Sequence, residues 1–300
     1  MTRWPNLFIA GAPRCGTTSL HAWLPAIPGV FMSRIKEPNF FSRCVIGDDY
    51  PLLKPIRKES DYLQLFSRAD DATFVGEATP FYLEDPEAPA QIKHKSPDAR
   101  ILISLRDPVD RLYSHYLMMR NNLADMGSFM DEIERGLALQ GNRNLAVLDR
   151  SIDLYSRQIE RYRGVFGNRR MMVLVLEEWT RDAERTLRAI SGFLGLKPVL
   201  KEFSASPQRR YGEARGPVVR YLFGNRQLSR ASEALIPFRL RKFVRNSLLV
   251  KAVPKPPMDP RAREFLVDYY WNDVQRTRRL VGRPLPWPNF EVQEPSLRAG

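Results

Sequence analysis

The hydrophobic pattern of the first two-thirds of the chain alternates short, continuous apolar runs with longer stretches of helical spacing. Short apolar runs bounded by turn residues are typical of buried β-strands. Five such runs predict strands at Leu7–Ala10, Gly29–Ser33, Thr73–Glu77, Ile101–Leu105 and Met171–Leu176. The last run is the most hydrophobic of the chain, and we predict that it forms a central strand.

Apolar residues at helical spacing lie between and after these runs. The predicted helices are Thr17 to about Pro25, Pro108–Arg120, Ser151–Phe166, Thr180–Leu194 and Pro260 to about Val281. In the second helix Asp107 can cap the first turn, Pro108 suits the first helical position, and Asp110 can close a capping box. Strands that alternate with helices predict an α/β fold, a P-loop-type parallel sheet with helices on both faces. In such sheets ligands bind at the carboxyl ends of the strands.

The character of the chain changes between Lys197 and Met258, where Gly, Pro and Arg become frequent and the periodicity weakens. Between Gln208 and Lys255 twelve basic residues face only Glu213 and Glu233. No internal repeat is present. We interpret residues 1–300 as one domain with a basic, irregular C-terminal insertion at 205–258, followed by the terminal helix at 260–281.

Composition and charge narrow the choice of class. The chain has 300 residues, of which 43% are hydrophobic and 27% charged, as in an ordinary globular enzyme. The net charge of +13 favours anionic partners such as nucleotides, nucleic acid, lipids or glycans. The chain has only two cysteines, Cys15 and Cys44, which is too few for a disulfide framework. The first apolar run is too short for a signal peptide. No apolar run reaches the length of a membrane span. We expect a soluble, cytoplasmic protein.

The first candidate site is the loop in LFIAGAPRCGTTSL (residues 7–20), which follows a predicted strand and opens a helix. Its glycines let an anion approach the backbone, and the loop amides point at that anion. The spacing matches the nucleotide triphosphatase loop except that Thr17 replaces the lysine, which argues against an ATP-dependent kinase. Arg14 is the cation of the loop, and Thr17 and Thr18 add hydroxyl donors. A strand–helix turn without a ligand is the disfavoured alternative.

A second candidate anion site lies in the segment Arg100–Met118. The predicted strand delivers Arg106 at its carboxyl end, and Ser114 follows two helical turns later. A strand-end cation and a helix hydroxyl can both reach one phosphate. The alternative is a surface cluster of Arg106, Asp107 and Arg111. Two anion sites on one sheet edge predict a ligand with two separate phosphate groups.

These segments resemble the PAPS-dependent sulfotransferase family, whose donor is 3′-phosphoadenosine 5′-phosphosulfate. GAPRCGTTSL is similar to its 5′-phosphosulfate loop and SLRDPVDRLYSHY to its 3′-phosphate motif. KEPNFFS (36–42), GEATPFYL (76–83) and the region from Arg261 to Trp287 resemble the bacterial branch related to the heparan sulfate sulfotransferases. The resemblance covers roughly Leu7 to Trp287. It implies transfer of a sulfo group to a hydroxyl or amine acceptor, with PAP as the product.

The resemblance also implies a set of donor contacts. These are Arg14, Cys15, Gly16, Thr17, Thr18, Ser19, Arg106, Ser114 and Arg215. The thiol of Cys15 can be reactive at a helix start, but a small residue that fills the turn is the favoured interpretation. Because the transferred group carries one negative charge, we expect no obligatory metal, and the scattered cysteines and histidines show no metal-ligand spacing.

Glu37 is the predicted general base, and the resemblance implies that it occupies the place of the family's catalytic acidic residue. Arg14 is predicted to stabilise the charge that develops on the leaving oxygen. Neighbouring Pro38, Phe40 and Phe41 can dry the surroundings of Glu37 and raise its pKa. A surface Lys36–Glu37 ion pair is the alternative, and Glu77 is the reserve candidate for the base. The histidines, His21, His94 and His115, are interpreted as structural or solvated.

Several positions depart from the commonest pattern of the related enzymes. Arg14 replaces a lysine, Asn39 a histidine, Ser42 an acidic residue and Ala78 a lysine. These changes disfavour a heparan-type glycan, so a small-molecule, lipid or glycan acceptor stays open.

The basic segment at 205–258 has three open interpretations: a loop over the 3′-phosphate, a surface for an anionic acceptor or a peripheral membrane contact, or a solvated surface. An ATP-dependent kinase or nucleotidase is the alternative function. A nucleic-acid-binding protein is not expected, because aromatic residues are not interleaved with the charges.

Overall fold

The computed structural model describes residues 3–42, 55–122, 126–138, 154–205, 212–214, 250–252 and 254–291. The chain groups into two compact units. The first contains residues 1–111, 153–208 and 265–300, and the second contains residues 112–152 and 209–264. The division of the chain into one domain with a basic insertion stays a prediction.

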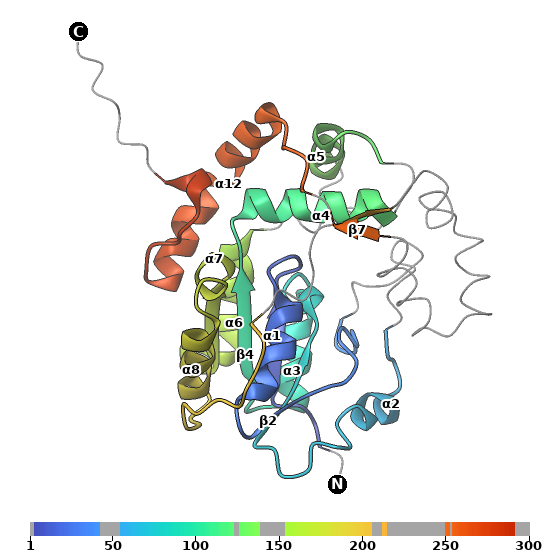
Figure 1. Ribbon diagram of the computed structural model, residues 1–300, viewed down its shortest axis with the longest axis vertical. Coiled ribbons are helices and arrows are strands. Elements are labelled where there is room, and N and C mark those ends of the chain that lie inside the picture. Colours follow the sequence, from blue (N-terminus) through green and yellow to red (C-terminus); the bar gives the residue numbers. More distant parts are fainter. Residues whose placement is uncertain are drawn as a thin grey trace, which may run out of the picture. The chain divides into compact units, whose positions relative to one another are not determined.

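The first unit is built on a five-stranded sheet in which every strand pairs in parallel with its neighbours (Figure 1). The strand order is β2-β3-β1-β4-β5. The strands are β1 (Leu7–Gly11), β2 (Val30–Met32), β3 (Phe74–Ala78), β4 (Arg100–Leu105) and β5 (Met171–Val175). The predicted α/β fold with a parallel sheet is confirmed, and the carboxyl ends of β1, β3 and β4 lie along one edge of the sheet.

The five predicted helices are present, and the structure adds helices that the sequence did not predict. The first unit contains α1 (Thr17–Trp23), α2 (Glu59–Gln64), α3 (Ala88–Lys95), α6 (Tyr155–Phe166), α7 (Leu176–Trp179) and α8 (Ala183–Phe193). Short 3-10 helices occupy Leu24–Ala26, Pro80–Tyr82, Asn168–Arg170 and Pro288–Phe290. Two longer helices, α4 (Pro108–Asn122) and α12 (Pro260–Val281), continue from one unit into the other.

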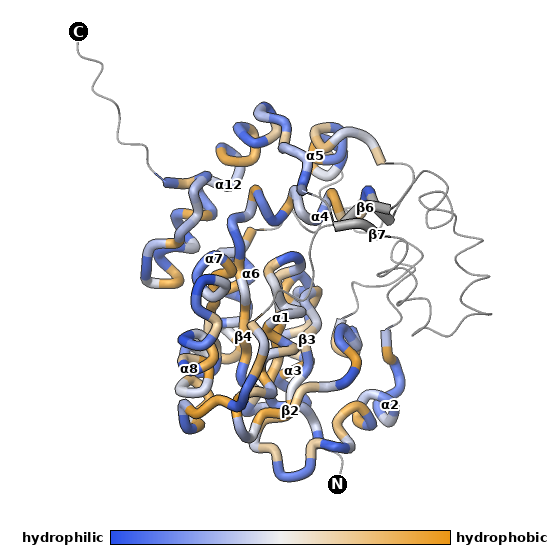
Figure 2. Tube along the Cα trace, viewed as in Figure 1, coloured by the Kyte–Doolittle hydropathy of each residue, from blue (hydrophilic) through white to orange (hydrophobic). Residues whose placement is uncertain are grey.

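The sheet is buried on both faces, as a parallel sheet requires. Leu7 and Ile9 pack with α1 and α8, while Phe8, the residue between them, contacts Phe41 on the opposite face. Figure 1 shows α1 and α8 in the foreground and α6 behind β4. In Figure 2 the hydrophobic colour gathers along the strands, and α8 alternates both colours, as expected for a helix with one face on the core. Each buried Leu or Ile stabilises the fold by about 1.5–3 kcal/mol.

The prediction that Met171–Leu176 forms a central strand is wrong for the sheet of the described residues. Strand β5 lies at the end of the strand order, paired with β4. Met171, Met172 and Val173 are only half-buried there. The high hydrophobicity of this run instead serves packing, since Met172 and Leu174 join the core under α1 and α8.

The start of α4 differs from the prediction in one of its two capping contacts. Asp107 caps the helix as predicted, because its Oδ1 accepts a hydrogen bond of 3.0 Å from the backbone N–H of Val109. The predicted capping box requires the backbone N–H of Asp107 to donate to the side chain of Asp110. In the structure this N–H donates to Glu177 Oε1 at 3.0 Å. A side chain 70 residues away in the chain therefore takes the local partner's place.

The second unit contains α5 (Phe129–Ala138) and a two-stranded antiparallel sheet of β6 (Gly212–Ala214) and β7 (Val250–Ala252). Tyr113, Tyr116 and Phe129 form an aromatic cluster between α4 and α5. The Tyr113 hydroxyl lies 3.0 Å from the carbonyl oxygen of Pro256, which fixes the end of the basic segment on α4. The rest of that segment lies largely outside the described residues, and no helix of the described ranges is long and apolar enough to span a membrane.

Candidate active site

The loop between β1 and α1 can be built only with glycines at both ends. A Cβ on Gly11 would lie 2.3 Å from Cβ of Leu83, and a Cβ on Gly16 would lie 2.3 Å from Cζ2 of Trp179. Gly16 also has a φ of +76°, a conformation that favours glycine. The sequence attributed these glycines to the approach of an anion, and the structure adds close packing of Leu83 and Trp179 against the loop.

Strand β4 and helix α7 hold this loop through hydrogen bonds. The backbone N–H of Ala12 donates to the carbonyl of Ser104 at 2.7 Å. The Ser104 hydroxyl donates to the Cys15 carbonyl at 2.7 Å and accepts from the Trp179 indole N–H at 3.0 Å. Because Ser104 and Trp179 are buried, these bonds are shielded from water. The loop is therefore fixed before any ligand binds.

The candidate donor contacts of the loop differ in their exposure. Arg14 has a left-handed φ of 67° and is half-buried, as is Thr18. Thr17 and Ser19 are buried. No side chain caps α1, and no acidic residue stands in its first turn. The loop thus presents a cation and backbone amides without a competing carboxylate of its own.

The thiol of Cys15 is fully buried. Burial raises the pKa of Cys15 to about 11, although the nearby charge of Arg111 opposes this shift. The sulfur lies 3.6 Å from the carbonyl oxygen of Pro13 and 3.7 Å from the hydroxyl of Tyr155. These contacts agree with the interpretation of Cys15 as a small residue that fills the turn.

Arg106 follows β4 and lies at the same sheet edge as the loop, because β1 and β4 are neighbours. Its carbonyl accepts a hydrogen bond of 3.0 Å from the hydroxyl of Tyr155. The N–H of the same peptide group, which belongs to Asp107, donates to Glu177. The peptide group that follows the Arg106 side chain is therefore fixed through both its C=O and its N–H, and the side chain itself is half-buried.

The sequence did not predict the residues that support Arg106. Glu177 Oε2 accepts the indole N–H of Trp287 at 3.3 Å, and the amide of Asn289 donates to Asp107 Oδ2 at 2.9 Å. Burial raises the pKa of Glu177, and it raises the pKa of Asp107 to about 6 with help from the charge of Asp110. These contacts join segments that lie 70 to 182 residues apart, so no local pattern could have indicated them.

Two further predicted donor contacts, Ser114 and Arg215, do not belong to the described part of the first unit. Ser114 is buried on α4, in the part of the helix that belongs to the second unit. Arg215 lies outside the described residues, as does Cys44. The first unit therefore brings together Arg106 and the loop residues Arg14–Ser19.

Glu37 lies beside the end of β3. Its backbone N–H donates to the carbonyl of Ala78 at 2.9 Å, and its own carbonyl accepts from the amide of Asn39 at 2.8 Å. The ion pair with Lys36 that the alternative interpretation requires is formed, but the side chains are only 15% (Lys36) and 23% (Glu37) exposed. The pair is thus part of the sheet edge and differs from a solvated surface pair.

Glu77, the reserve candidate, is fully buried. Tyr62 and Tyr82 donate to its Oε1 at 2.8 Å each, and Thr79 donates to its Oε2 at 2.6 Å. Burial raises the pKa of Glu77 to about 7, while the three hydroxyls oppose this shift. An enclosed carboxylate cannot touch an acceptor, so Glu37 is the better placed of the two glutamates.

The histidines occupy structural or solvated positions. Nε2 of His21 lies 3.0 Å from the carbonyl oxygen of Ser33, and burial together with Lys36 lowers the pKa of His21 to about 4. His115 is buried on α4 and His94 is exposed on α3.

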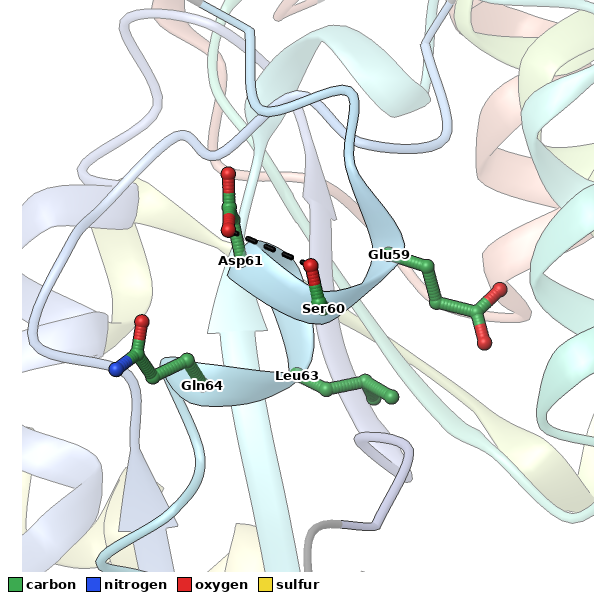
Figure 3. A pocket seen from close by; sticks show the side chains of 5 residues that line it. All are labelled: Glu59, Ser60, Asp61, Leu63 and Gln64. Carbon is green, nitrogen blue, oxygen red and sulfur yellow. Dashed lines mark hydrogen bonds between the residues drawn. The ribbon is translucent and has the colours of Figure 1, made fainter.

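A shallow surface hollow on α2 contains no predicted site residue (Figure 3). Its lining consists of Glu59, Ser60, Asp61, Leu63 and Gln64. The acidic side chains Glu59 and Asp61 disfavour an anionic donor there.

Comparison with known proteins gives consistent matches. The sulfotransferase domain family matches residues 5–209. Human carbohydrate sulfotransferase 15 is 27% identical over 261 residues, which cover 67% of this chain and 45% of that protein. Human heparan sulfate glucosamine 3-O-sulfotransferase 3B1 is 29% identical over 203 residues, which cover 66% of this chain and 48% of that protein.

The chain thus spans about half the length of these curated relatives. A crystal structure of a sulfotransferase from Alicyclobacillus acidocaldarius superimposes with a TM-score of 0.68 at 28% identity. That match covers 94% of this chain and 97% of the other.

Proposed function

The chain belongs to the sulfotransferase domain family, and from this premise we propose that it transfers a sulfo group from PAPS to a hydroxyl or amine acceptor. The observation that carries the proposal is the pair of half-buried arginines at one sheet edge. Arg14 follows β1 and Arg106 follows β4, and each stands on backbone that neighbouring side chains fix. Such a pair suits a ligand with two separated anionic groups.

The loop residues fit the phosphosulfate end of this donor. Glycines at both ends leave the backbone open to an anion, and Arg14 can hold phosphate oxygens in a bidentate manner. Thr17 stands where a nucleotide triphosphatase has lysine, so an ATP-dependent kinase or nucleotidase is not favoured. Arg106 would take the 3′-phosphate, with Ser114 and Arg215 as further predicted contacts.

Sulfo transfer is an in-line displacement at sulfur, in which the bond to the nucleotide phosphate breaks as the acceptor bond forms. Glu37 would accept the proton that the acceptor hydroxyl or amine loses. Negative charge grows on the leaving phosphate oxygen, and Arg14 with the loop amides would stabilise that charge. The Glu37 side chain forms an ion pair with Lys36 beside this sheet edge.

A carbohydrate is the acceptor class that we propose first, since the related proteins are named for carbohydrate and heparan sulfate glucosamine sulfation. Asn39, Ser42 and Ala78 depart from the heparan-related pattern, so we expect a different sugar or a different position on it. The cytoplasmic location and a membrane contact of the basic segment stay predictions.

The test is a screen with radiolabelled PAPS against desulfated heparan, chondroitin and dermatan chains, together with lipids and phenols. PAP should raise the melting temperature, because a ligand that binds only the folded state stabilises it. Stabilisation by ATP with Mg²⁺ but not by PAP would replace this proposal with the kinase alternative.

A further inference from the structure

A buried carboxylate lies directly beneath the segment that carries the proposed base. Glu77 accepts hydrogen bonds from Tyr62, Tyr82 and Thr79 at 2.8, 2.8 and 2.6 Å. All four side chains are fully buried, and we call them the Glu77 cluster. A carboxylate that accepts three hydroxyl protons sets the direction of each hydroxyl, because each must present its lone pairs elsewhere.

Two of the three hydroxyls use those lone pairs to bind the neighbouring backbone. The Tyr82 hydroxyl accepts the N–H of Phe41 at 3.2 Å, and the Thr79 hydroxyl accepts the N–H of Asn39 at 3.4 Å. The segment Glu37–Phe41 is thereby connected to Glu77 at two of its amides. A third amide, that of Glu37, donates to the carbonyl of Ala78.

The segment needs such support because its backbone is strained. Glu37 and Asn39 have φ values of 62° and 53°, in the left-handed region. A non-glycine residue there costs on the order of 1–2 kcal/mol, and tertiary contacts must hold it in place. The side-chain amide of Asn39 adds support by donating a hydrogen bond to the backbone carbonyl of Glu37.

We propose that Glu77 is a positioning residue for sulfo transfer: it orients Thr79 and Tyr82, which fix Glu37–Phe41 and so hold the Glu37 carboxylate at the acceptor side of the site. The proposal rests on the proposed function and on Glu37 as the base. Glu77 itself takes no proton from the acceptor, since it is enclosed. The two carboxylate oxygens of Glu77 hold all three hydroxyls at once.

Tyr62 provides a matched control within the same cluster. Its hydroxyl donates to the same Glu77 oxygen as Tyr82 over the same distance, and both rings are fully buried. Within the described residues its hydroxyl makes no hydrogen bond to Glu37–Phe41, and its ring stacks on Phe40 with centroids 4.2 Å apart. A phenylalanine keeps that stacking. Tyr62→Phe therefore removes one hydrogen bond to Glu77 but no hydrogen bond to the backbone of Glu37–Phe41.

The first measurement compares turnover with donor binding in Glu77→Gln, Tyr82→Phe, Thr79→Val and Tyr62→Phe. Rates are taken with PAPS and the polysaccharide that gives the wild type its highest rate in the screen, and PAP affinity is taken by calorimetry. We expect kcat to fall roughly 10–100-fold in the first three variants, since a small misplacement of a reacting group has effects of this size. PAP affinity should stay within about twofold, and Thr79→Ser, which keeps the hydroxyl, should restore turnover.

The second measurement needs no acceptor. Hydrogen exchange at the backbone amides of Asn39 and Phe41 reports their hydrogen bonds to Thr79 and Tyr82 directly, because these two N–H groups are the donors. Exchange at Phe41 should quicken in Tyr82→Phe and Glu77→Gln but not in Tyr62→Phe.

Equal loss of kcat in Tyr62→Phe and Tyr82→Phe would overturn the proposal, as would normal turnover in a folded Glu77→Gln protein. If Glu77→Gln does not fold, the Tyr82 and Tyr62 pair decides. A different outcome is that hydrogen exchange at Phe41 changes as expected but the wild-type protein transfers no sulfo group. That outcome would refute the proposed function and leave the linkage from Glu77 to the backbone intact.

Discussion

Replacing Glu77 by Gln should change how the stability of the protein depends on pH. Burial raises the folded-state pKa of Glu77 to about 7, from an ordinary value of 4.5. The folded state therefore binds this proton more tightly than the unfolded state does. The protonated carboxyl contributes its full share of the free energy of unfolding below about pH 4.5. This contribution falls as the pH rises and is lost once the pH passes about 7. One pKa unit corresponds to about 1.4 kcal/mol, so the shift gives a loss of about 3 kcal/mol across this window.

The tyrosines that face Glu77 do not titrate in that window, because burial raises the pKa values of Tyr62, Tyr82 and Tyr162 well above 10. The charge of Lys36 lowers the pKa of Glu77 and is present in both proteins. Other groups, including Asp107, titrate equally in both proteins and cancel in the difference. Glu77→Gln removes the titration but keeps the shape of the side chain.

The assay is urea unfolding of both proteins at pH 5, 6, 7 and 8, followed by tryptophan fluorescence. Between pH 5 and 8 the free energy of unfolding of the wild type, minus that of Glu77→Gln, should fall by about 2.5 kcal/mol. The lost hydrogen bonds add a constant offset that does not depend on pH. A difference that stays flat from pH 5 to 8 would refute the argument, because it would mean that Glu77 has an ordinary pKa in the folded protein.

Three further predictions concern the proposed reaction. Arg106→Ala should weaken PAP binding by about 10–100-fold, because a lost charge-assisted hydrogen bond costs about 1.5–3 kcal/mol. Binding of adenosine 5′-phosphosulfate should hardly change, because this ligand lacks the 3′-phosphate. Equal losses of affinity for both ligands in calorimetry would contradict the placement of Arg106. Glu37→Gln should lower turnover by about 10²–10⁴-fold and leave PAP affinity unchanged, whereas near-normal turnover in a folded variant would rule out Glu37 as the base. Transfer should continue in EDTA, and a complete loss that Mg²⁺ reverses would move the enzyme toward phosphoryl transfer.

The fold was predictable because its signals are local. Short apolar runs bounded by turns predicted five strands within about one residue of their observed ends, and Asp107 caps its helix as expected. The order of strands in a sheet is not a local property. The run at Met171–Leu176 therefore predicted a strand correctly and its central position wrongly, since a strand at the end of the order can also bury apolar side chains.

The site was predictable only where a motif carries its chemistry in consecutive residues. The loop and Arg106 follow from such motifs, but their supports do not. Ser104, Trp179 and Glu177 reach the loop or Arg106–Asp107 from distant segments, and no spacing rule connects them. Cys15 shows the same limit in its energetics: a helix start lowers a thiol pKa, yet full burial outweighs that effect and raises the value to about 11.

The two sides of the proposed reaction are held by different parts of the scaffold. The donor side depends on β4 and α7, through Ser104 and Trp179, while Glu37 depends on β3 and the Glu77 cluster. No residue belongs to both sets of hydrogen bonds within the described ranges. Because side chains that share no partner act nearly independently, a change around Glu77 can alter the acceptor side while the donor loop keeps its geometry. The departures at Asn39 and Ala78 both lie next to Thr79, in the part of the scaffold that holds Glu37. We therefore predict that substitutions there change acceptor preference more than PAP affinity.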